Sequence, residues 1–526
     1  MTGSTGGARA RPVDRKPSEK MMTRFKRLAG LWPVLAGLLA AAGQAPLSAW
    51  PLSLAGFALL FVAMQDAPRP ARAARAGWLF GFGYFLAALA WIVEPFMVDI
   101  ARDGWMAPFA LLLMAGGLAL FWGGAAWIAA RLAPRGLPLV LAAAALLTLA
   151  EALRGWIFTG FPWALIGHNL IPSPLLPLAA LGGPHLLTLL LLLPAFGLGW
   201  TLRAPRRARP AVLTLLAYGL PLGLALALPP RALPAGPDAP VVRLVQPNAA
   251  QRVKWDPEMI PVFFGRQLDY SAAPTETGGR PALIIWPETS VPYLLNEGAE
   301  LTDILAEAAQ GSPVAFGIQR RERAAYFNSL ALLDGNADVV ATYDKHHLVP
   351  FGEYLPLGHL LERFGLGALA SQFGTGYSPG PGAQILDIPG VGKALPLICY
   401  EAVFPRDIRE APGRADLLLQ ITNDAWFGSF SGPYQHLAQA RLRAVENALP
   451  MVRVGNTGIS ALISADGEIL DSLPLNTEGY LDVALPPPSA ATPYSRFGDL
   501  PALLLAIALL CTGAGAAVNQ RFSRVA

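Results

Sequence analysis

The sequence predicts a polytopic α-helical membrane bundle of about eight spans that carries an inserted α/β domain. Of its 526 residues, 53% are hydrophobic and 14% are charged, whereas soluble domains average about 25% charged residues. The apolar residues are also unevenly placed. Long apolar runs fill residues 28–230 and 498–518, and residues 239–488 have an ordinary density of charge. A membrane bundle with a separate globular domain accounts for both observations.

Eight apolar runs set the expected spans, because a helix that crosses the hydrocarbon core needs about 20 mostly apolar residues. We expect a seven-span transmembrane domain within residues 28–230 and an eighth transmembrane helix within residues 498–518. The runs cover residues 29–46, 49–65, 77–98, 107–130, 137–153, 175–201, 211–229 and 500–518.

Basic residues in the short loops predict the orientation, because Arg and Lys accumulate on the cytoplasmic side of a membrane. They fill the tail 1–27 and the loops after the second, fourth and sixth runs, so all basic loops lie on one side. We therefore expect a cytoplasmic N-terminal tail and a globular domain on the outer face of the membrane. This distribution explains the pI of about 9.1 without a nucleic-acid partner.

A cleavable signal peptide is an alternative interpretation of the N-terminal region, with a small-residue site near Leu39–Gly43. Cleavage there would leave the later topology unchanged. We favour retention, because no clear Ala-x-Ala site precedes a soluble segment. Two cysteines cannot form a disulfide framework and do not define the compartment.

Short β-rich runs alternate with segments of helical periodicity in residues 239–488, which predicts a layered α/β domain. The expected helices cover residues 301–310 and 433–448. The expected strands cover residues 241–246, 282–286, 314–318, 329–333, 339–343, 395–398 and 417–421.

Three of these strands are followed by residues that suit acyl transfer: Glu288, Lys345 and Cys399. In an open α/β sheet, side chains from several strands converge beyond the carboxyl ends. A carboxylate can accept the thiol proton, the thiolate can attack, and an ammonium can hold the oxyanion. Each residue alone has an ordinary explanation: a buried Cys is usually inert, a Glu can cap a helix, and a Lys can be solvated.

The segments around these residues resemble the nitrilase superfamily. They are Trp286-Pro287-Glu288, the stretch from Asp344 to Glu353, and Ile398-Cys399-Tyr400-Glu401. With seven spans before and one after, the chain resembles the membrane branch of that superfamily, the bacterial apolipoprotein N-acyltransferases. Further matches are Gln246-Pro247-Asn248, Lys254-Trp255, the stretch from Asn423 to Gly428, Gln435-His436, Arg441 to Glu446, Asn456-Thr457-Gly458 and Gly160 to Trp163. Only residues 1–20 have no counterpart.

The resemblance implies an α-β-β-α sandwich for residues 239–488, the nitrilase-like catalytic domain. It also implies a Glu-Lys-Cys triad at the residues already singled out. Glu288 would be the general base, Lys345 the oxyanion stabiliser and Cys399 the nucleophile.

Five further residues receive roles from the same resemblance. Glu353 would orient Lys345 or share its proton traffic, and Tyr400 and Glu401 would support the site. Trp255 and Trp426 would form walls of the acyl or headgroup pocket. An ordinary role as buried core aromatics is the alternative for both tryptophans.

The implied reaction moves a fatty acyl chain from a membrane phospholipid, through a Cys399 thioester, to an apolipoprotein. The acceptor would be the α-amino group of the N-terminal S-diacylglyceryl-cysteine, in the last step of bacterial lipoprotein maturation. The implied partners are the phospholipid donor, the apolipoprotein and the bilayer, at the bacterial inner membrane.

Two other functions fit parts of the sequence. A membrane-tethered amidase or nitrilase could hydrolyse a small C–N substrate, but one helix would suffice as its tether. A transporter or sensor with an inactive nitrilase-like domain would usually carry ionisable residues within its spans. Only Glu151 and Arg154 come close, and the complete triad argues against an inactive domain.

No cofactor and no metal is expected. The histidines have no metal-binding spacing such as His-Glu-x-x-His, and the sequence contains neither a Gly-x-Gly-x-x-Gly motif nor a P-loop.

The apolar, Gly-rich stretch 355–375 has two interpretations. It could be a buried core helix, since Leu357, Leu360, Leu361 and Phe364 have helical spacing. It could also be a mobile lid that covers the triad and guides acyl chains.

Overall fold

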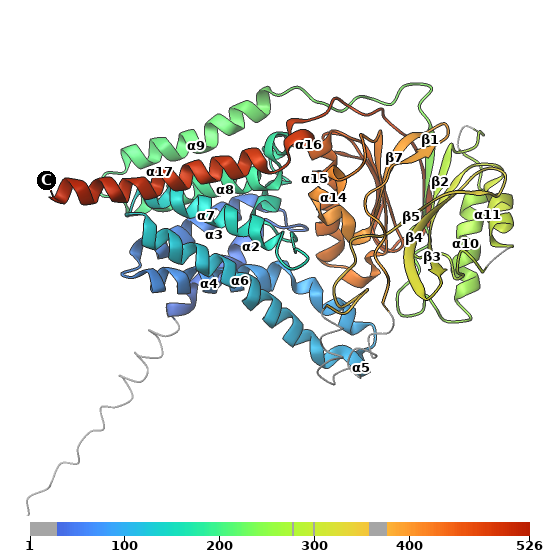
Figure 1. Ribbon diagram of the computed structural model, residues 1–526, viewed down its shortest axis with the longest axis horizontal. Helices are drawn as coiled ribbons and strands as arrows, with labels where there is room; N and C mark the ends of the chain where they lie inside the picture. The colour runs from blue at the N-terminus through green and yellow to red at the C-terminus, as the bar shows by residue number, and fades with distance from the viewer. Residues whose placement is uncertain (1–28, 276–277, 298–299, 357–375, 526) are drawn as a thin grey trace, which may run out of the picture.

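The computed structural model describes residues 29–275, 278–297, 300–356 and 376–525. Its chain forms two parts that lie side by side, a helical bundle and an α/β part (Figure 1). The bundle contains the helices before residue 230 and the final helix, and the strands lie between them in the sequence. The predicted tail 1–27 and nearly all of the predicted lid 355–375 lie outside the described residues.

Helices of the bundle often have a proline in their first turn. Proline suits this position because the backbone N–H that it lacks would have no hydrogen-bond partner within the helix. Pro33, Pro51, Pro70, Pro108 and Pro138 occupy such positions. The α-helices are α2 (Trp32–Ala41), α3 (Trp50–Asp66), α4 (Pro70–Ala88), α5 (Ile100–Asp103), α6 (Ala107–Leu132), α7 (Leu137–Arg154), α8 (Ala179–Arg203), α9 (Ala208–Ala227), α16 (Pro493–Phe497) and α17 (Leu500–Val525). Short 3₁₀ helices are η1 (Ala29–Leu31), η2 (Ala90–Met97), η3 (Gly104–Met106), η4 (Ile166–Leu170) and η5 (Leu176–Leu178).

Four described helices are long and apolar enough to cross a membrane, and α4 with η2 would make a fifth if their 45° bend is counted within one span. At three other predicted spans the structure has apolar helices of 10–17 residues, which are shorter than the four long ones. They are Trp32–Ala41, Trp50–Asp66 and Leu500–Ala516. The predicted eight spans are therefore not confirmed. The four long helices are Ile100–Leu132, Leu137–Arg154, Leu176–Arg203 and Ala208–Ala227.

Helices α2 and α4 pack with their backbones in close approach. A Cβ atom added at Gly37 would lie 2.0 Å from the carbonyl oxygen of Phe80, and one at Gly83 would lie 2.2 Å from that of Val34. Small residues at helix interfaces are the usual means of tight packing in membranes. Glycine is therefore required at both positions.

Two six-stranded sheets form the centre of the α/β part. The first sheet contains, in order, β12 (Gly479–Ala484), β1 (Val241–Gln246), β2 (Leu283–Ile285), β3 (Val314–Glu322), β4 (Ala325–Leu333) and β5 (Val339–Asp344). The second contains β11 (Ile469–Leu473), β10 (Ser460–Ile463), β9 (Met451–Gly455), β8 (Leu417–Thr422), β7 (Gly392–Ile398) and β6 (Leu386–Ile388). The β1–β2–β3 and β7–β8–β9 neighbours pair in parallel.

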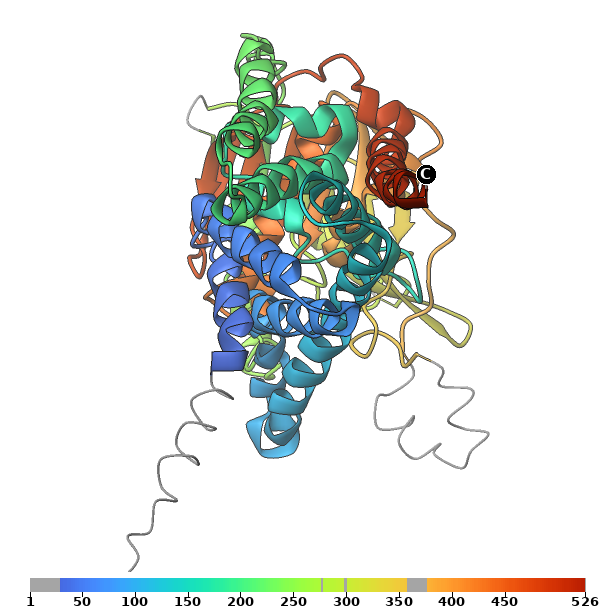
Figure 2. The same cartoon turned by 90° about the vertical axis from the view of Figure 1, so that its left-hand side faces the viewer.

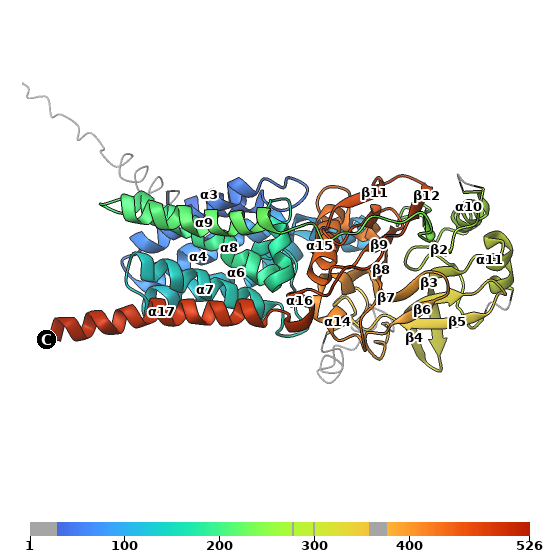
Figure 3. The ribbon, with the colours of Figure 1, turned by 90° about the horizontal axis from the view of Figure 1, so that it is seen from above.

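Helices cover the outer face of each sheet, so the layers run α-β-β-α, as Figure 3 shows from above. Helices α10 (Ile260–Ala272) and α11 (Leu301–Ala309) cover the first sheet. Helices α14 (Pro405–Arg409) and α15 (Gly432–Asn447) cover the second and face the bundle. The sandwich, the seven predicted strands and both predicted helices are confirmed within a few residues at their ends. Strands β6 and β9 to β12 and helices α10 and α14 were not predicted.

Contacts between polar side chains and backbone carbonyls join the two parts. Trp163 of the bundle donates its indole N–H to Gln435 Oε1 on α15 at 2.7 Å. The Gln435 amide donates in turn to the carbonyl oxygens of Ala88 at 3.0 Å and Ala45 at 3.2 Å. Figure 2, seen from the bundle end, shows the helices in front of the α/β part. Helix α15 is thus fastened to the bundle.

Candidate active site

The three predicted catalytic residues follow strands β2, β5 and β7, and the structure brings them together. The Lys345 ammonium lies 3.5 Å from Glu288 Oε1. Cys399 is close enough to both that their charges shift its pKa. All three side chains are buried.

Hydrogen bonds fix both oxygens of the Glu288 carboxylate. Asn328 Nδ2 donates to Oε1 and the backbone N–H of Asn423 donates to Oε2, each at 2.8 Å. The carboxylate thus keeps one orientation beside Lys345. This suits a general base, whose acceptor oxygen must be aimed at the proton it removes.

Lys345 is buried between two carboxylates. Its Nζ donates to Glu353 Oε1 at 2.9 Å, in addition to the contact with Glu288. Burial disfavours the charged amine, but Glu353 and then Glu288 outweigh it and raise the pKa of Lys345. Lys345 is therefore an ammonium at neutral pH, and a positive charge suits the stabilisation of an oxyanion.

Glu353 is held by its own loop. The backbone N–H of Val349 donates to Glu353 Oε2 at 2.8 Å, and Asn328 Nδ2 lies 3.1 Å from Oε1. Asn328 on β4 therefore bridges Glu288 and Glu353. The sequence interpretation missed Asn328, because one Asn within an apolar strand carries no motif.

Cys399 begins the 3₁₀ helix η6 (Cys399–Val403) with a φ of 52°, a left-handed backbone conformation that is uncommon for any residue except glycine. Burial raises the pKa of the Cys399 thiol, the Glu288 charge raises it further, and Lys345 opposes both. The resting residue is therefore a thiol. Attack by this sulfur would require its proton to pass to a neighbouring base.

Glu401 and Tyr400 directly follow Cys399, and both are buried. Glu401 accepts hydrogen bonds from the backbone N–H groups of Ile398 at 2.7 Å and His346 at 2.8 Å, so it ties the ends of β5 and β7 together. Tyr400 packs edge-on against the ring of His347, at 5.7 Å between centroids. Glu401 thus acts on the backbone that carries Lys345 and Cys399.

Trp255 and Trp426 are 43% and 40% exposed. They are not buried core aromatics, so that alternative is wrong for both. Trp255 lines a pocket, and Trp426 lies in η7 (Asp424–Phe427), which packs against η2 of the bundle. Their predicted role as substrate-binding walls remains a prediction.

A buried polar network lies beneath Cys399. His436 on α15 shares a 2.9 Å hydrogen bond with Asp424, which also pairs with Arg453. Burial opposes the charge on Asp424, but Arg453 and His436 lower its pKa to about 2. Burial and the Arg453 charge lower the pKa of His436, so its imidazole is neutral and Nδ1–H donates to Asp424.

The described histidines of the α/β part have carboxylate neighbours: His346 with Glu401, His347 with Asp407 and His436 with Asp424. In the part of the chain that the structure describes, no three His, Cys, Asp or Glu side chains are grouped as metal ligands. His359 lies outside that part.

A sandwich of this topology, with a buried Glu, Lys and Cys at its strand ends, defines a carbon–nitrogen hydrolase domain, here joined to apolar helices. Residues 242–492 match the carbon–nitrogen hydrolase family model, and residues 36–197 match that of the apolipoprotein N-acyltransferase N-terminal domain. The chain belongs to the apolipoprotein N-acyltransferase family.

Similar proteins carry that family name. The chain is 40% identical to the apolipoprotein N-acyltransferase of Rhizobium etli, over 82% of this chain and 85% of the relative. It is 36% identical to that of Rhizobium rhizogenes, over 90% and 92%. It is 37% identical to that of Brucella suis, over 85% and 86%.

Proposed function

We propose that this chain is a membrane-bound N-acyltransferase that moves a fatty acyl chain from a phospholipid to the α-amino group of the S-diacylglyceryl-cysteine of apolipoproteins. The observation that carries the proposal is the Lys345 ammonium between Glu353 and Glu288, next to the buried Cys399. The family to which the chain belongs supports the substrates.

The first half-reaction forms a thioester. The Glu288 carboxylate takes the proton of the Cys399 thiol while Sγ attacks the ester carbonyl carbon of the phospholipid. The new S–C bond leaves an oxyanion that Lys345 stabilises. When the oxyanion collapses, the C–O ester bond breaks, Glu288 gives its proton to the leaving alkoxide, and lysophospholipid departs.

The second half-reaction transfers the acyl group. The α-amino nitrogen of the acceptor attacks the thioester carbon and forms the N–C bond. The C–S bond breaks, the amine proton passes to Glu288, and that proton restores the Cys399 thiol. A covalent intermediate lets one site serve two lipid substrates in turn.

The apolar helices support a membrane location. Leu113 and Leu120 on α6 and Leu215, Leu220 and Leu226 on α9 are largely exposed. Lipid tails would cover these side chains, since a large exposed apolar surface is rare on a soluble protein. We place residues 28–230 and 498–518 in the inner membrane and the catalytic domain 239–488 on the periplasmic face, with the eight spans of the sequence interpretation.

Incubation of the purified protein with a phospholipid labelled in its acyl chain tests the proposal. We expect a hydroxylamine-sensitive label on the protein, which an acceptor lipopeptide removes as a new amide. Release of a small amine from simple amides, without lipid-dependent labelling, would favour the tethered amidase. If neither reaction occurs, both functions are contradicted.

A further inference from the structure

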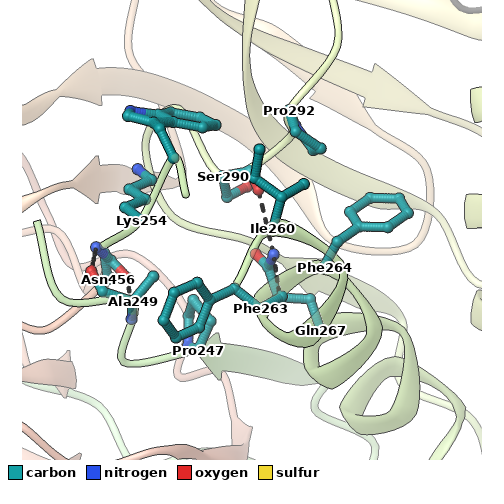
Figure 4. Close-up of a pocket in the computed structure, with 11 residues that line it drawn as sticks. Pro247, Ala249, Lys254, Ile260, Phe263, Phe264, Gln267, Ser290, Pro292 and Asn456 are labelled. Carbon is teal, nitrogen blue, oxygen red and sulfur yellow. Dashed lines mark hydrogen bonds between the residues drawn. The ribbon is translucent and has the colours of Figure 1, made fainter. Parts of the chain in front are cut away.

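A pocket of ≈ 290 Å³, part of it open to solvent, lies between the segment after β1 and helix α10 (Figure 4). Its walls are mainly apolar, and they also include Lys254, Gln267 and Ser290. The apolar lining residues include Pro247, Trp255, Ile260, Phe263, Phe264 and Pro292.

Lys254 brings a cation into this pocket. The side chain is buried, with 5% exposed, and its Nζ lies 5.0 Å from the centroid of the Trp255 ring. Within the described residues, the ammonium has neither a hydrogen bond nor an ion pair. A buried charge without a counter-charge is costly. Burial lowers the pKa of Lys254 to about 8, although Glu288 partly offsets it.

Gln267 adds an acceptor that also lacks a partner. Its Nε2 donates to the carbonyl oxygens of Phe263 and Ser290, each at 3.2 Å. Its Oε1 is buried and has no hydrogen-bond donor among the described residues. The pocket thus presents one unpaired cation and one unpaired acceptor within apolar walls.

The pocket adjoins the candidate base. Ser290 lies two residues after Glu288, and Asn456 on the pocket wall donates to Asn423 Oδ1 at 2.9 Å. The backbone N–H of Asn423 in turn binds Glu288. A group that occupies the pocket therefore lies beside the reacting residues.

The same segment also contacts the bundle. The Arg252 guanidinium donates to the carbonyl oxygen of Met97 in η2 at 3.2 Å. Since Lys254 follows Arg252 by two residues, the segment that carries Lys254 is also fixed to the bundle.

We propose that this pocket binds the phosphodiester of the acyl donor, with the Lys254 ammonium against the phosphate and an O–H or N–H of the headgroup against Gln267 Oε1. This inference rests on the proposed function. A phospholipid always carries an anion next to its scissile esters, whereas the diacylglyceryl-cysteine end of the acceptor carries none. The lysophospholipid product retains the phosphate and binds in the same way.

The Lys254→Met variant tests whether Lys254 binds the phosphate, when its reactions with two acyl donors are compared. Phosphatidylglycerol carries the phosphodiester, and p-nitrophenyl palmitate is uncharged. We expect the KM for phosphatidylglycerol, measured by acyl-enzyme formation, to rise about 10- to 100-fold, the range for loss of a charge-assisted hydrogen bond. The KM for the p-nitrophenyl ester should stay within about twofold. Lys393→Met, which removes an exposed lysine, is the matched control.

Equal losses with both donors would overturn the assignment, because they would mean that Lys254 acts through Glu288 or through folding. An unchanged KM for phosphatidylglycerol would overturn it as well. If the unmodified protein forms no acyl-enzyme with either donor, the proposed function itself fails.

A binding measurement needs no change at Lys254. Cys399→Ala protein should bind lysophosphatidylglycerol more tightly than monoacylglycerol at pH 7. The preference should fall as the pH rises through about 8 and the Lys254 ammonium loses its proton. Equal binding of both lipids at pH 7 would contradict a phosphate site.

Discussion

The side-chain amide of Gln420 donates a 3.2 Å hydrogen bond to the carbonyl oxygen of Cys399. Arg453 donates to Gln420 Oε1 at 2.6 Å, so the amide nitrogen must face Cys399. That nitrogen also lies 3.0 Å from Nε2 of the neutral His436, which can accept its second proton. Since left-handed backbone costs about 1–3 kcal/mol outside glycine, we infer that Gln420 helps to hold Cys399 in its left-handed conformation.

Replacement of Gln420 should therefore slow the reaction without changing any reacting group. We expect Gln420→Met to lower kcat about tenfold or more, with little change in KM, and to reduce the free energy of unfolding by about 1–3 kcal/mol because Arg453 loses an acceptor. Gln439→Met is the control, since Gln439 is buried on α15 and its side-chain amide donates to the Gln435 carbonyl oxygen. Equal kcat values for the two variants would refute the positioning role.

The acyl group should be found on Cys399 and not on Cys511. Cys399→Ser should lose nearly all turnover and thioester label, because a serine hydroxyl is a far weaker nucleophile beside the same base. Cys511→Ala should behave as the unchanged protein, since Cys511 lies on α17 away from the site. Mass spectrometry of the trapped intermediate locates the label, and a label on Cys511 would exclude the proposed nucleophile.

The pH dependence of alkylation should report the buried thiol. Because the folded-state pKa of Cys399 is raised, the thiolate fraction at pH 8 should lie below that of an ordinary cysteine, whose pKa is about 8.5. Iodoacetamide should thus react slowly at pH 8 in a Cys511→Ala background, and its rate should still be rising above pH 9. A rate that levels off below pH 8 would indicate a lowered pKa and a resting thiolate.

Arginine should not replace Lys345. Lys345→Arg keeps the positive charge, but a planar guanidinium cannot occupy the place of a compact ammonium between two carboxylates. We expect kcat/KM to fall by about 10²–10³-fold, the usual effect of losing an oxyanion donor. Lys393→Arg, on the exposed face of β7, should have no effect. Near-normal activity of Lys345→Arg would remove Lys345 from the oxyanion role.

Single-turnover experiments should distinguish the roles of Glu288 and Glu353 in acyl-enzyme formation. Glu288→Gln keeps the shape of the side chain but cannot accept the thiol proton, so acyl-enzyme formation should be abolished. Glu353→Gln should slow acylation less, because Lys345 would keep its 3.5 Å contact with Glu288. If Glu288→Gln acylates normally, the base is another carboxylate, and Glu353 is the first candidate because it contacts the same Asn328 and Lys345.

The sequence predicted the residues that stand directly after strands, and it missed those inside strands. Glu288, Lys345 and Cys399 each interrupt an apolar pattern where a strand ends. Asn328 and Gln420 lie within β4 and β8, where a single amide does not mark a site. Their importance depends on partners 16 to 40 residues away in the chain, which only the tertiary fold brings close.

Composition also located the apolar helices better than it located their ends. The predicted run 29–46 contains a helix that ends at Ala41, and a turn follows it. The run 77–98 is divided at Leu89, where η2 begins at an angle and contains Pro95. Alanine, glycine and proline count as apolar or neutral in such a run, although proline changes the direction of the backbone.

Gln435 and His436 are neighbours on α15, yet one is bonded to the bundle and the other adjoins the backbone of the nucleophile. Trp163, Gln435 and the adjacent His436 thus form a short chain of contacts from the bundle to the backbone of Cys399. A fragment that contains only the α/β part would lose the contacts of Gln435 with the bundle. The packing of the helical bundle therefore helps to fix the position of the Cys399 backbone in the α/β part.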